Sequence, residues 1–223
     1  MESDLDQTLS SFSAMLNSAS LIFWDFDGVI KDSVEVKTLA YENLFLPFGG
    51  ETASRVRHHH ENHGGVSRFD KIPMYLRWAG EPANPAQVEV YCERFSKSVL
   101  QAVIDSPWVP GVREYLLQHF PQQYFVLLTA TPQDEIEKIL AALDLSTCFR
   151  EVHGAPTKKS DAIRAVMSQL GSAPAKTLMI GDAETDLRAA QANSIPFLLR
   201  RTSLNQPLQG SYSGPMFDHL NYE

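Results

Sequence analysis

The sequence predicts an α/β fold, in which a parallel β-sheet carries helices on both faces and a helical unit is inserted near the start. Short apolar runs, each typical of a buried strand, alternate along the chain with segments of helical periodicity. Polar residues stand at the ends of three of these runs. The first two runs are separated by far more chain than one connecting helix requires.

The predicted strands are four compact apolar runs, which are short enough for buried strands. They are residues 21–24, 125–128, 177–180 and 196–199, with residues 150–153 as a candidate fifth strand. The clearest helical segments between them are residues 111–120, 133–143, 160–170 and 184–193. Ser160 stands where the N-cap of its helix is expected, and Gly171 stands where that helix should end.

The long separation between the first two strands predicts an inserted domain. Asp25 and Thr129, which stand at the ends of these two strands, are 104 residues apart. A βαβ unit needs roughly 30 residues, so about 70 residues are in excess. The excess is mostly helical in pattern, as in residues 34–45 and 85–104.

We therefore expect a helical cap domain at residues 33–106, over a core made of residues 1–32 and 107–223. Residues 1–19 are an N-terminal extension of this core, either a short docking helix or a frayed end. Its apolar residues stand at helix-like spacing: Leu5, Leu9, Phe12 and Leu16. In the tail, residues 201–214 are predicted as loop and residues 216–220 as a segment that ties the chain end to the core.

Composition and charge exclude several classes of partner. Hydrophobic residues make up 43% of the 223 residues, and the net charge of −8 argues against a nucleic-acid partner. No apolar run is long enough to span a bilayer, and the acidic start does not resemble a secretory signal. We expect a cytoplasmic monomer or homodimer that acts on a small molecule, with no nucleic-acid or membrane partner.

Two carboxylates two residues apart, Asp25 and Asp27, follow the first apolar run, and Gly28 then allows a sharp turn. A carboxylate at the end of a buried strand is costly unless it meets a cation. The pair suits a nucleophile beside a proton carrier. Asp182 and Asp186 add acidic groups at another strand end, and such oxygen ligands favour Mg²⁺.

These residues, with Thr129 and Lys159, resemble in order the four motifs of the haloacid dehalogenase superfamily, over about residues 20–200. The helical insertion resembles the alpha-helical cap of that family, as in phosphoglycolate phosphatase and beta-phosphoglucomutase relatives. The resemblance implies a Rossmann-like core with a cap. It also implies a Mg²⁺-dependent phosphatase that hydrolyses a small phosphorylated metabolite, such as a sugar phosphate or a phosphoglycolate-like compound.

The resemblance assigns roles to the acidic residues. Asp25 is expected to be the nucleophile that forms an aspartyl-phosphate. Asp27 is expected to protonate the leaving oxygen and then to activate water. The carboxylates of Asp25 and Asp182, with the backbone carbonyl of Asp27, are expected to bind Mg²⁺. Asp186 is expected to support the metal through water or through the metal's own ligands.

The phosphoryl oxygens are expected to be bound by Thr129 and a lysine. Related sequences show two spacings for that lysine, and we favour Lys159 as the catalytic residue, with Lys158 as a substrate-binding one. A lysine here can neutralise the negative charge on a phosphoryl group during its transfer. Gly28 and Ala130 are the other substrate-binding residues expected in the core.

One stretch of the insertion resembles a Gly-Val-Ser-Arg segment in the cap of beta-phosphoglucomutase, where the arginine contacts the phosphate that is not transferred. Ser67 and Arg68 are therefore expected to bind substrate, with Arg68 recognising a second phosphate or carboxylate. The alternative is that Arg68 covers the cap surface. The histidines at positions 58–60 and 63 are expected to lie partly exposed on a cap helix and not to bind a metal.

Four other functions compete with a phosphatase. A dehalogenase is disfavoured, because the second carboxylate, Asp27, serves phosphoryl transfer and has no role in displacing halide. A phosphomutase would use Arg68, but Lys37 stands where the resemblance to mutases predicts a histidine. A phosphonatase would need a cap lysine that forms a Schiff base, for which Lys37 and Lys71 are candidates. A non-catalytic binding module would lack an acidic motif residue, and all of them are present. The sequence leaves the substrate open.

Overall fold

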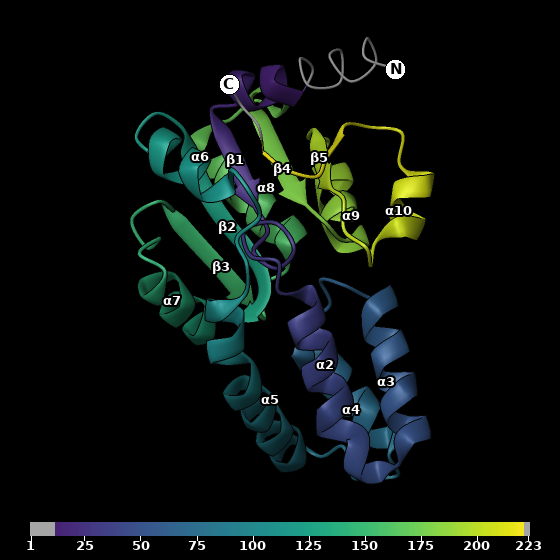
Figure 1. Ribbon diagram of the computed structural model, residues 1–223. Coiled ribbons are helices and arrows are strands. Elements are labelled where there is room, and N and C mark those ends of the chain that lie inside the picture. Colours follow the sequence, from purple (N-terminus) through teal and green to yellow (C-terminus); the bar gives the residue numbers. More distant parts are fainter. Residues whose placement is uncertain (1–11, 221–223) are drawn as a thin grey trace.

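The computed structural model describes residues 12–220 and has a six-stranded sheet in the order β3-β2-β1-β4-β5-β6 (Figure 1). Every neighbouring pair of strands runs parallel, which confirms the predicted α/β class. The strands are β1 (Leu21–Trp24), β2 (Tyr124–Pro132), β3 (Glu151–Ala155), β4 (Thr177–Gly181), β5 (Phe197–Arg200) and β6 (Met216–Phe217).

The helices divide between the faces of the sheet and its carboxyl edge. Those of the sheet faces and the tail are α6 (Val112–His119), α7 (Gln133–Ala142), α8 (Lys159–Leu170), α9 (Glu184–Ala192) and α10 (Gln206–Ser211). Those inserted after β1 are α2 (Val34–Phe45), α3 (Gly50–Asn62), α4 (Arg68–Trp78) and α5 (Pro85–Asp105). Short 3-10 turns lie at Leu46–Phe48 and Pro174–Lys176.

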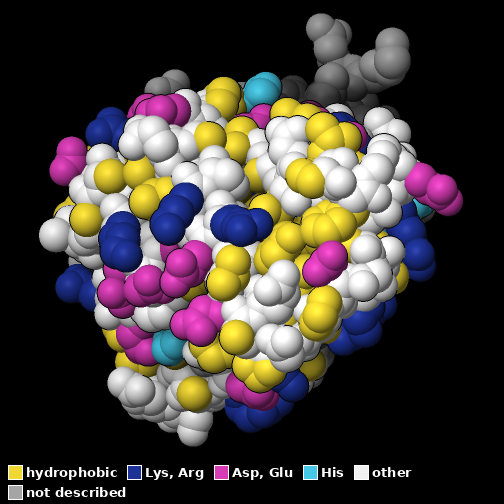
Figure 2. Space-filling view, turned by 90° about the horizontal axis from the view of Figure 1, so that it is seen from below, with side chains coloured by type: hydrophobic (Ala, Val, Ile, Leu, Met, Phe, Trp, Pro, Cys, Tyr) yellow, Lys and Arg dark blue, Asp and Glu magenta, His cyan; other side chains and the backbone are white. Residues whose placement is uncertain are grey.

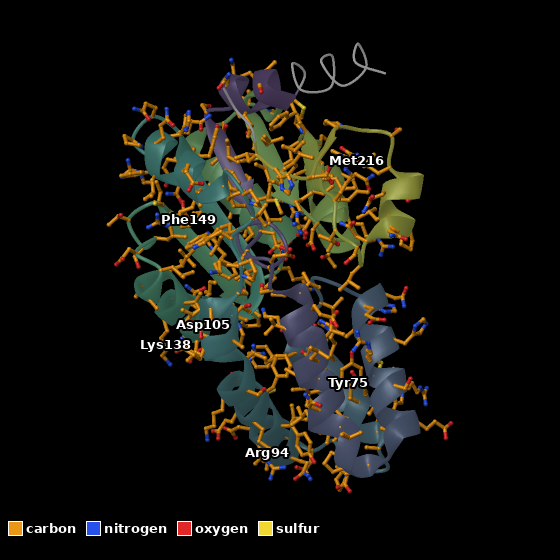
Figure 3. The ribbon with its side chains drawn as sticks, viewed as in Figure 1. Tyr75, Arg94, Asp105, Lys138, Phe149 and Met216 are labelled. Carbon is orange, nitrogen blue, oxygen red and sulfur yellow. The ribbon has the colours of Figure 1, made fainter. Side chains whose placement is uncertain are left out.

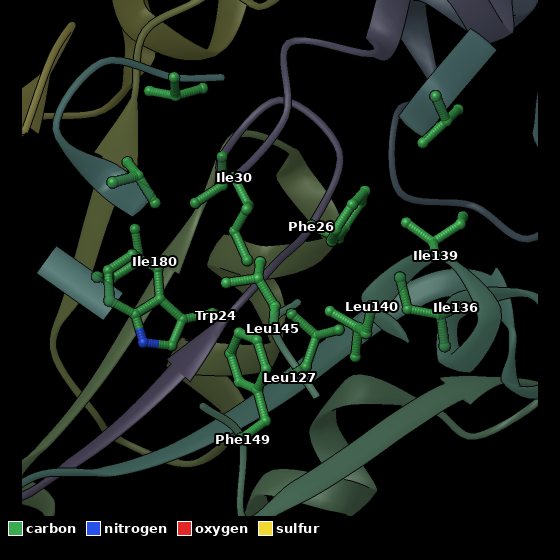
Figure 4. Packing of buried hydrophobic residues seen from close by; sticks show 14 of the residues in the cluster. Trp24, Phe26, Ile30, Leu127, Ile136, Ile139, Leu140, Leu145, Phe149 and Ile180 are labelled. Carbon is green, nitrogen blue, oxygen red and sulfur yellow. The ribbon is translucent and has the colours of Figure 1, made fainter. Parts of the chain in front are cut away.

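Alternation along β1 sends side chains to two separate cores. Ile22 and Trp24 pack with the apolar faces of α6 and α7, in the cluster shown in Figure 4. Leu21 and Phe23 pack on the other face with residues of α8 and α9. Successive strand residues point to opposite faces, so a strand buried on both faces is apolar throughout. This is why the run at residues 21–24 has no polar member.

Helices α2 to α5, called here the helical group, lie together beyond the carboxyl ends of the strands (Figure 1). Aromatic packing joins them, because Tyr75 of α4 meets Tyr41 and Phe45 of α2 edge to face, and Tyr75 lies inside the group in Figure 3. Figure 2 shows the face seen from the helical side, where basic and acidic side chains intermingle. The polar groups that follow the strands therefore face the helical group.

The two ends of the described chain pack together. Residues 12–18 are helical, and the Phe12 ring stacks on Phe217 of β6 with centroids 6.2 Å apart. The Gln123 side-chain amide donates to the carbonyl of Leu16 at 2.7 Å. This part of the N-terminal extension is docked, whereas Leu5 and Leu9 lie outside the described residues. None of the described helices is long and apolar enough to cross a membrane.

Three local predictions were wrong. The predicted loop at residues 201–214 contains α10. A side-chain hydrogen bond of 2.6 Å, donated by Gln209 to Asn205, stabilises the start of this helix. Helix α8 begins at Lys159, so Ser160 lies inside its first turn and is not its N-cap. Strand β2 runs on to Pro132, so Thr129 lies within the strand and not at its end.

Candidate active site

Asp25 directly follows β1, the strand that lies between β2 and β4 in the sheet. Its backbone N–H donates to the carbonyl of Ile180 at 2.9 Å, so the β-ladder continues to the residue itself. The Asp25 side chain is buried. Strand β4 ends at Gly181, and Asp182 therefore emerges beside Asp25 at the same edge, where ligands bind in parallel sheets of this kind.

Three carboxylates meet at this edge. Asp25, Asp182 and Asp186 each offer an oxygen, and these oxygens all lie within 4.8 Å of one another. Asp186 is oriented by its own helix, because the backbone N–H of Ala183 donates to its Oδ2 at 3.1 Å, as in a capping box. All three carboxylates are buried, so their mutual repulsion is not screened by water.

Two glycines leave room for this cluster. Gly28 has a φ of +77°, and a Cβ placed there would lie 2.2 Å from Oδ2 of Asp182. A Cβ at Gly181 would lie 2.3 Å from the Cβ of Asp186. A side chain at either position would displace a carboxylate, so both glycines shape the acidic cluster.

Lys159 is the cation of the cluster. Its Nζ lies 2.8 Å from Oδ1 of Asp25 and 2.5 Å from Oδ1 of Asp186. Burial by itself would lower the Lys159 pKa, but Asp186 and then Asp25 outweigh it and raise that pKa above its ordinary value. The neighbouring Lys158 is exposed. Of the two lysines that the sequence leaves as candidates, the structure brings Lys159 to the carboxylates.

The charges in the cluster remain unbalanced despite the lysine. Burial raises the pKa of Asp25 to about 7, against the lowering effect of Lys159 and with further raising by Asp186 and Asp27. Burial, followed by the charges of Asp25 and Asp186, raises the pKa of Asp182 well above its usual range. Carboxylates in this state gain most from a hard divalent cation, and their oxygens are the ligands that Mg²⁺ prefers. The donor set fits the predicted metal.

Asp27 faces the helical group. Its Oδ2 accepts from Nζ of Lys37 at 2.5 Å, and its Oδ1 accepts from the Ser33 hydroxyl at 2.7 Å. Burial would raise the pKa of Asp27, but the Lys37 ammonium and its hydrogen bond, with Ser33, hold that pKa below its usual value. Lys37 also donates to Oγ1 of Thr131 at 2.8 Å. The sequence analysis missed this network, for which the four-residue spacing of Ser33 and Lys37 was the available signal.

The middle of the edge is formed by the carboxyl end of β2. Thr129 is buried, and its Oγ1 accepts the backbone N–H of Thr131 at 3.1 Å. Ala130 and Thr131 line a cavity between the sheet edge and the helical group, of about 60 Å³. Carboxylates of the core and basic side chains of the helical group also line it: Asp25, Asp27, Asp182, Lys37, His60 and Arg68.

Arg68 lines the cavity, but its guanidinium is already paired. It donates to both carboxylate oxygens of Glu135, at 2.8 and 2.6 Å, and also to Oγ of Ser96. Ser67 caps α4, since its hydroxyl accepts the backbone N–H of Phe69 at 3.3 Å. Substrate binding by Arg68 and Ser67 stays a prediction, and the sequence analysis missed Glu135 as a partner.

The loop before α4 touches the core beside the acidic cluster. The Thr185 hydroxyl of α9 lies 3.5 Å from the carbonyl of Gly64, and a Cβ at Gly65 would lie 2.0 Å from that hydroxyl. The helical group therefore packs over the carboxylates. His60, expected to be partly exposed, is instead buried and faces this cavity.

Fold and site together define an α/β protein with a buried acidic cluster, a lysine and a small cavity at the carboxyl edge of a parallel sheet. A family model for haloacid dehalogenase-like hydrolases matches residues 22–199. The chain is 32% identical over 195 residues to a phosphoglycolate phosphatase of Nitrosococcus oceani, covering 80% of this chain and 82% of that protein. The chain belongs to the haloacid dehalogenase-like hydrolase family.

One further relative agrees with this membership, and one solved structure agrees with the fold. A phosphoglycolate phosphatase of Pseudomonas syringae pv. syringae is 29% identical over 184 residues, which are 78% of this chain and 66% of that protein. A solved structure described as a predicted phosphoglycolate phosphatase from Haemophilus somnus has a TM-score of 0.70 at 18% identity, covering 91% of this chain and 95% of that one. The predicted family and the class of enzyme, a hydrolase related to phosphatases, are confirmed.

Proposed function

We propose that the protein is a Mg²⁺-dependent phosphatase that transfers a phosphoryl group from a small metabolite to Asp25 and then to water. The observation that carries this proposal is the buried group of Asp25, Asp182 and Asp186, joined by Lys159 and facing a small cavity. Residues 33–106 would act as a cap domain over a core of residues 1–32 and 107–223. A cytoplasmic location and a monomeric or homodimeric state are part of the same proposal.

The metal would be held by the carboxylates of Asp25 and Asp182 and by the backbone carbonyl of Asp27, with Asp186 in support. When bound, Mg²⁺ would neutralise the carboxylates and the charge on the transferring phosphoryl oxygens. Lys159 adds a second positive charge beside Asp25. Among these groups, the buried nucleophile and the anionic phosphate can approach each other without prohibitive repulsion.

In the first step, a carboxylate oxygen of Asp25 attacks phosphorus, and the bond from phosphorus to the leaving oxygen breaks as Asp27 passes to that oxygen the proton that the phosphate monoester monoanion brings into the site. In the second step, water attacks the aspartyl-phosphate, Asp27 takes its proton, and inorganic phosphate leaves Asp25. Lys37 and Ser33 orient the Asp27 carboxyl for both transfers.

The phosphoryl oxygens would be bound by Lys159, Thr129 and the backbone around Ala130 and Gly28, with Lys158 at the outer margin of the site. The cavity of about 60 Å³ beside Asp25 and Asp27 supports a small substrate. Thr129, Ala130, Lys158 and Lys159 line a second cavity of about 440 Å³, which shares Gly65, Val66 and Ala130 with the first. The names of the related phosphoglycolate phosphatases support a phosphoglycolate-like compound or a sugar phosphate.

A phosphate-release screen tests the proposal. Phosphoglycolate, sugar phosphates and nucleotides are each supplied with Mg²⁺, and the released phosphate is measured. With a hexose monophosphate, free phosphate and isomerised sugar phosphate are followed together. Release of phosphate without isomer supports a phosphatase, whereas isomer without stoichiometric phosphate would replace this proposal by a phosphomutase.

A further inference from the structure

A second pair of buried ionisable groups lies on the helical side of the cavity. Nζ of Lys71, in α4, is 2.8 Å from Nδ1 of His60, in α3. Only 1% of Lys71 and 7% of His60 is exposed. His60 lines the cavity and Lys71 lies behind it. The proposed chemistry uses neither residue, so their burial calls for another explanation.

Lys71 differs from the other buried cations around the cavity in its partners. Lys37 is paired with Asp27, Arg68 with Glu135, and Lys159 with carboxylates of the acidic cluster. Within residues 12–220, no carboxylate lies at ion-pair distance from Lys71. Burial and then the nearby Lys37 lower the Lys71 pKa to about 7, against a smaller raising effect of the more distant Asp27. Below pH 7, Lys71 is therefore mostly an ammonium, which faces the Tyr41 ring at 5.8 Å and has no carboxylate at ion-pair distance within the described residues.

The hydrogen bond with Lys71 also determines which ring nitrogen of His60 carries the proton. An ammonium has three donors and no acceptor, so protonated Lys71 requires Nδ1 of His60 to accept. The imidazole proton then resides on Nε2, the remaining polar atom of a ring that lines the cavity. Burial, followed by the charges of Lys71 and Lys37, lowers the His60 pKa well below its ordinary value and keeps the ring neutral. When Lys71 is protonated, His60 is thus a hydrogen-bond donor polarised by an adjacent cation.

We propose that His60, positioned by Lys71, binds a carboxylate on the substrate, one or two carbon atoms away from the phosphate that is transferred. This inference rests on the proposed phosphatase function and names the substrate class, small phosphorylated carboxylic acids. The sequence predicts that Arg68 binds such an anion, but its guanidinium already donates to both carboxylate oxygens of Glu135. His60 presents one N–H donor, which suits a carboxylate better than a second phosphate with three acceptor oxygens.

The test compares phosphoglycolate with 2-hydroxyethyl phosphate, which has the same skeleton but a hydroxymethyl group in place of the carboxylate. Because a hydrogen bond to a charged group is the stronger kind, we expect wild-type kcat/KM to favour phosphoglycolate by about tenfold to a hundredfold. His60→Ala should remove most of this preference, mainly through KM. His60→Gln, which keeps a donor near the position of Nε2, should restore part of it, and His60→Asn should not.

Lys71→Met should weaken the preference in the same direction, because the tautomer of His60 is then no longer imposed. His58→Ala, an exposed histidine on the same helix, and Lys97→Met, an exposed lysine on α5, are the matched controls and should keep the wild-type preference. Equal losses on both esters in His60→Ala would overturn the proposal and leave the phosphatase function intact.

Nitrogen-15 NMR of the histidine rings gives a readout that needs no turnover. Below pH 7, where Lys71 is protonated, we expect the proton of His60 on Nε2 in the wild type and a mixed tautomer in Lys71→Met. A proton on Nδ1 in the wild type would overturn the proposal whatever the activity. Failure of the wild type to hydrolyse any phosphate ester would instead contradict the proposed function. Trapping of a Lys71 adduct by borohydride with an aldehyde substrate would also overturn the inference, in favour of a Schiff-base role.

Discussion

Arg68 and Glu135 form a buried, bidentate ion pair that joins the helical group to the core. The guanidinium of Arg68 in α4 donates to both oxygens of Glu135 in α7, and only 3% and 5% of the two residues is exposed. Ser96 of α5 donates to the same carboxylate at 2.5 Å. Arg68 also lines the cavity, so the pair links the cavity wall to the core.

Breaking this pair from one side should destabilise the protein. Arg68→Met leaves Glu135 buried without a counter-ion, and the unfolding free energy in urea should fall by about 3–5 kcal/mol. Arg68→Met combined with Glu135→Met should recover most of that loss. Arg164→Met, in an exposed pair with Asp161, is the control and should change stability by less than about 0.5 kcal/mol.

Arg68→Met also tests the predicted role of Arg68 in substrate binding. Since its guanidinium is held by Glu135, we expect Arg68→Met to lower kcat/KM for phosphoglycolate and 2-hydroxyethyl phosphate by similar factors. A loss confined to phosphoglycolate would show that Arg68 leaves Glu135 to bind the carboxylate.

Asp25→Asn should abolish turnover while the fold stays intact, because an amide cannot act as the nucleophile. We expect phosphate release to fall by about a thousandfold or more. Circular dichroism and thermal unfolding check the fold. Activity at a tenth of the wild-type level or above would disprove the assignment of Asp25.

Activity should vanish with a chelator and return with Mg²⁺. Ca²⁺ should inhibit, because it accepts more ligands and looser geometry than in-line transfer needs. Asp182→Asn should raise the Mg²⁺ concentration needed for half-maximal activity, whereas Asp161→Asn, on the exposed start of α8, should not. Full activity in excess chelator is the result that contradicts a metal-dependent reaction.

Gly28→Ala should damage the site more than the fold. The new Cβ would lie 2.2 Å from Oδ2 of Asp182, and a misplacement of about 1 Å in an active site can cost a hundredfold in rate. Gly171→Ala is the control, since its φ is +61° but no atom lies within 4 Å of the added Cβ. Both variants should lose about 1 kcal/mol of stability from the positive φ. Only Gly28→Ala should lose activity.

Lys71 should make stability depend on pH with a defined sign. Its pKa is about 7 in the folded protein, below the ordinary 10.5, so the unfolded chain binds more protons between these values. The unfolding free energy of the wild type relative to Lys71→Met should therefore rise with pH above 7, by up to about 1.4 kcal/mol per unit. Urea unfolding of both proteins from pH 6 to 9 measures it. Lys37 and Asp27, the charged neighbours of Lys71, are common to both proteins. A difference that does not change with pH would contradict the prediction.

Much of the fold was predictable because its signals are local. The apolar run at residues 21–24 and the helix at residues 34–45 appear in the structure with the predicted bounds. Helix α10 was missed, since a Pro-, Gln- and Gly-containing segment has weak helical propensity and depends on the hydrogen bonds of Asn205.

The sequence by itself determined that Asp25 and Asp182 would meet, because residues that follow neighbouring parallel strands emerge at one edge of the sheet. Only the tertiary structure decided which lysine reaches them, and that Arg68 pairs with Glu135, 67 residues away. The tertiary structure alone likewise decided that His60 pairs with Lys71. These partners lie on different helices whose relative placement depends on side-chain packing, and no periodicity or spacing along the chain encodes it.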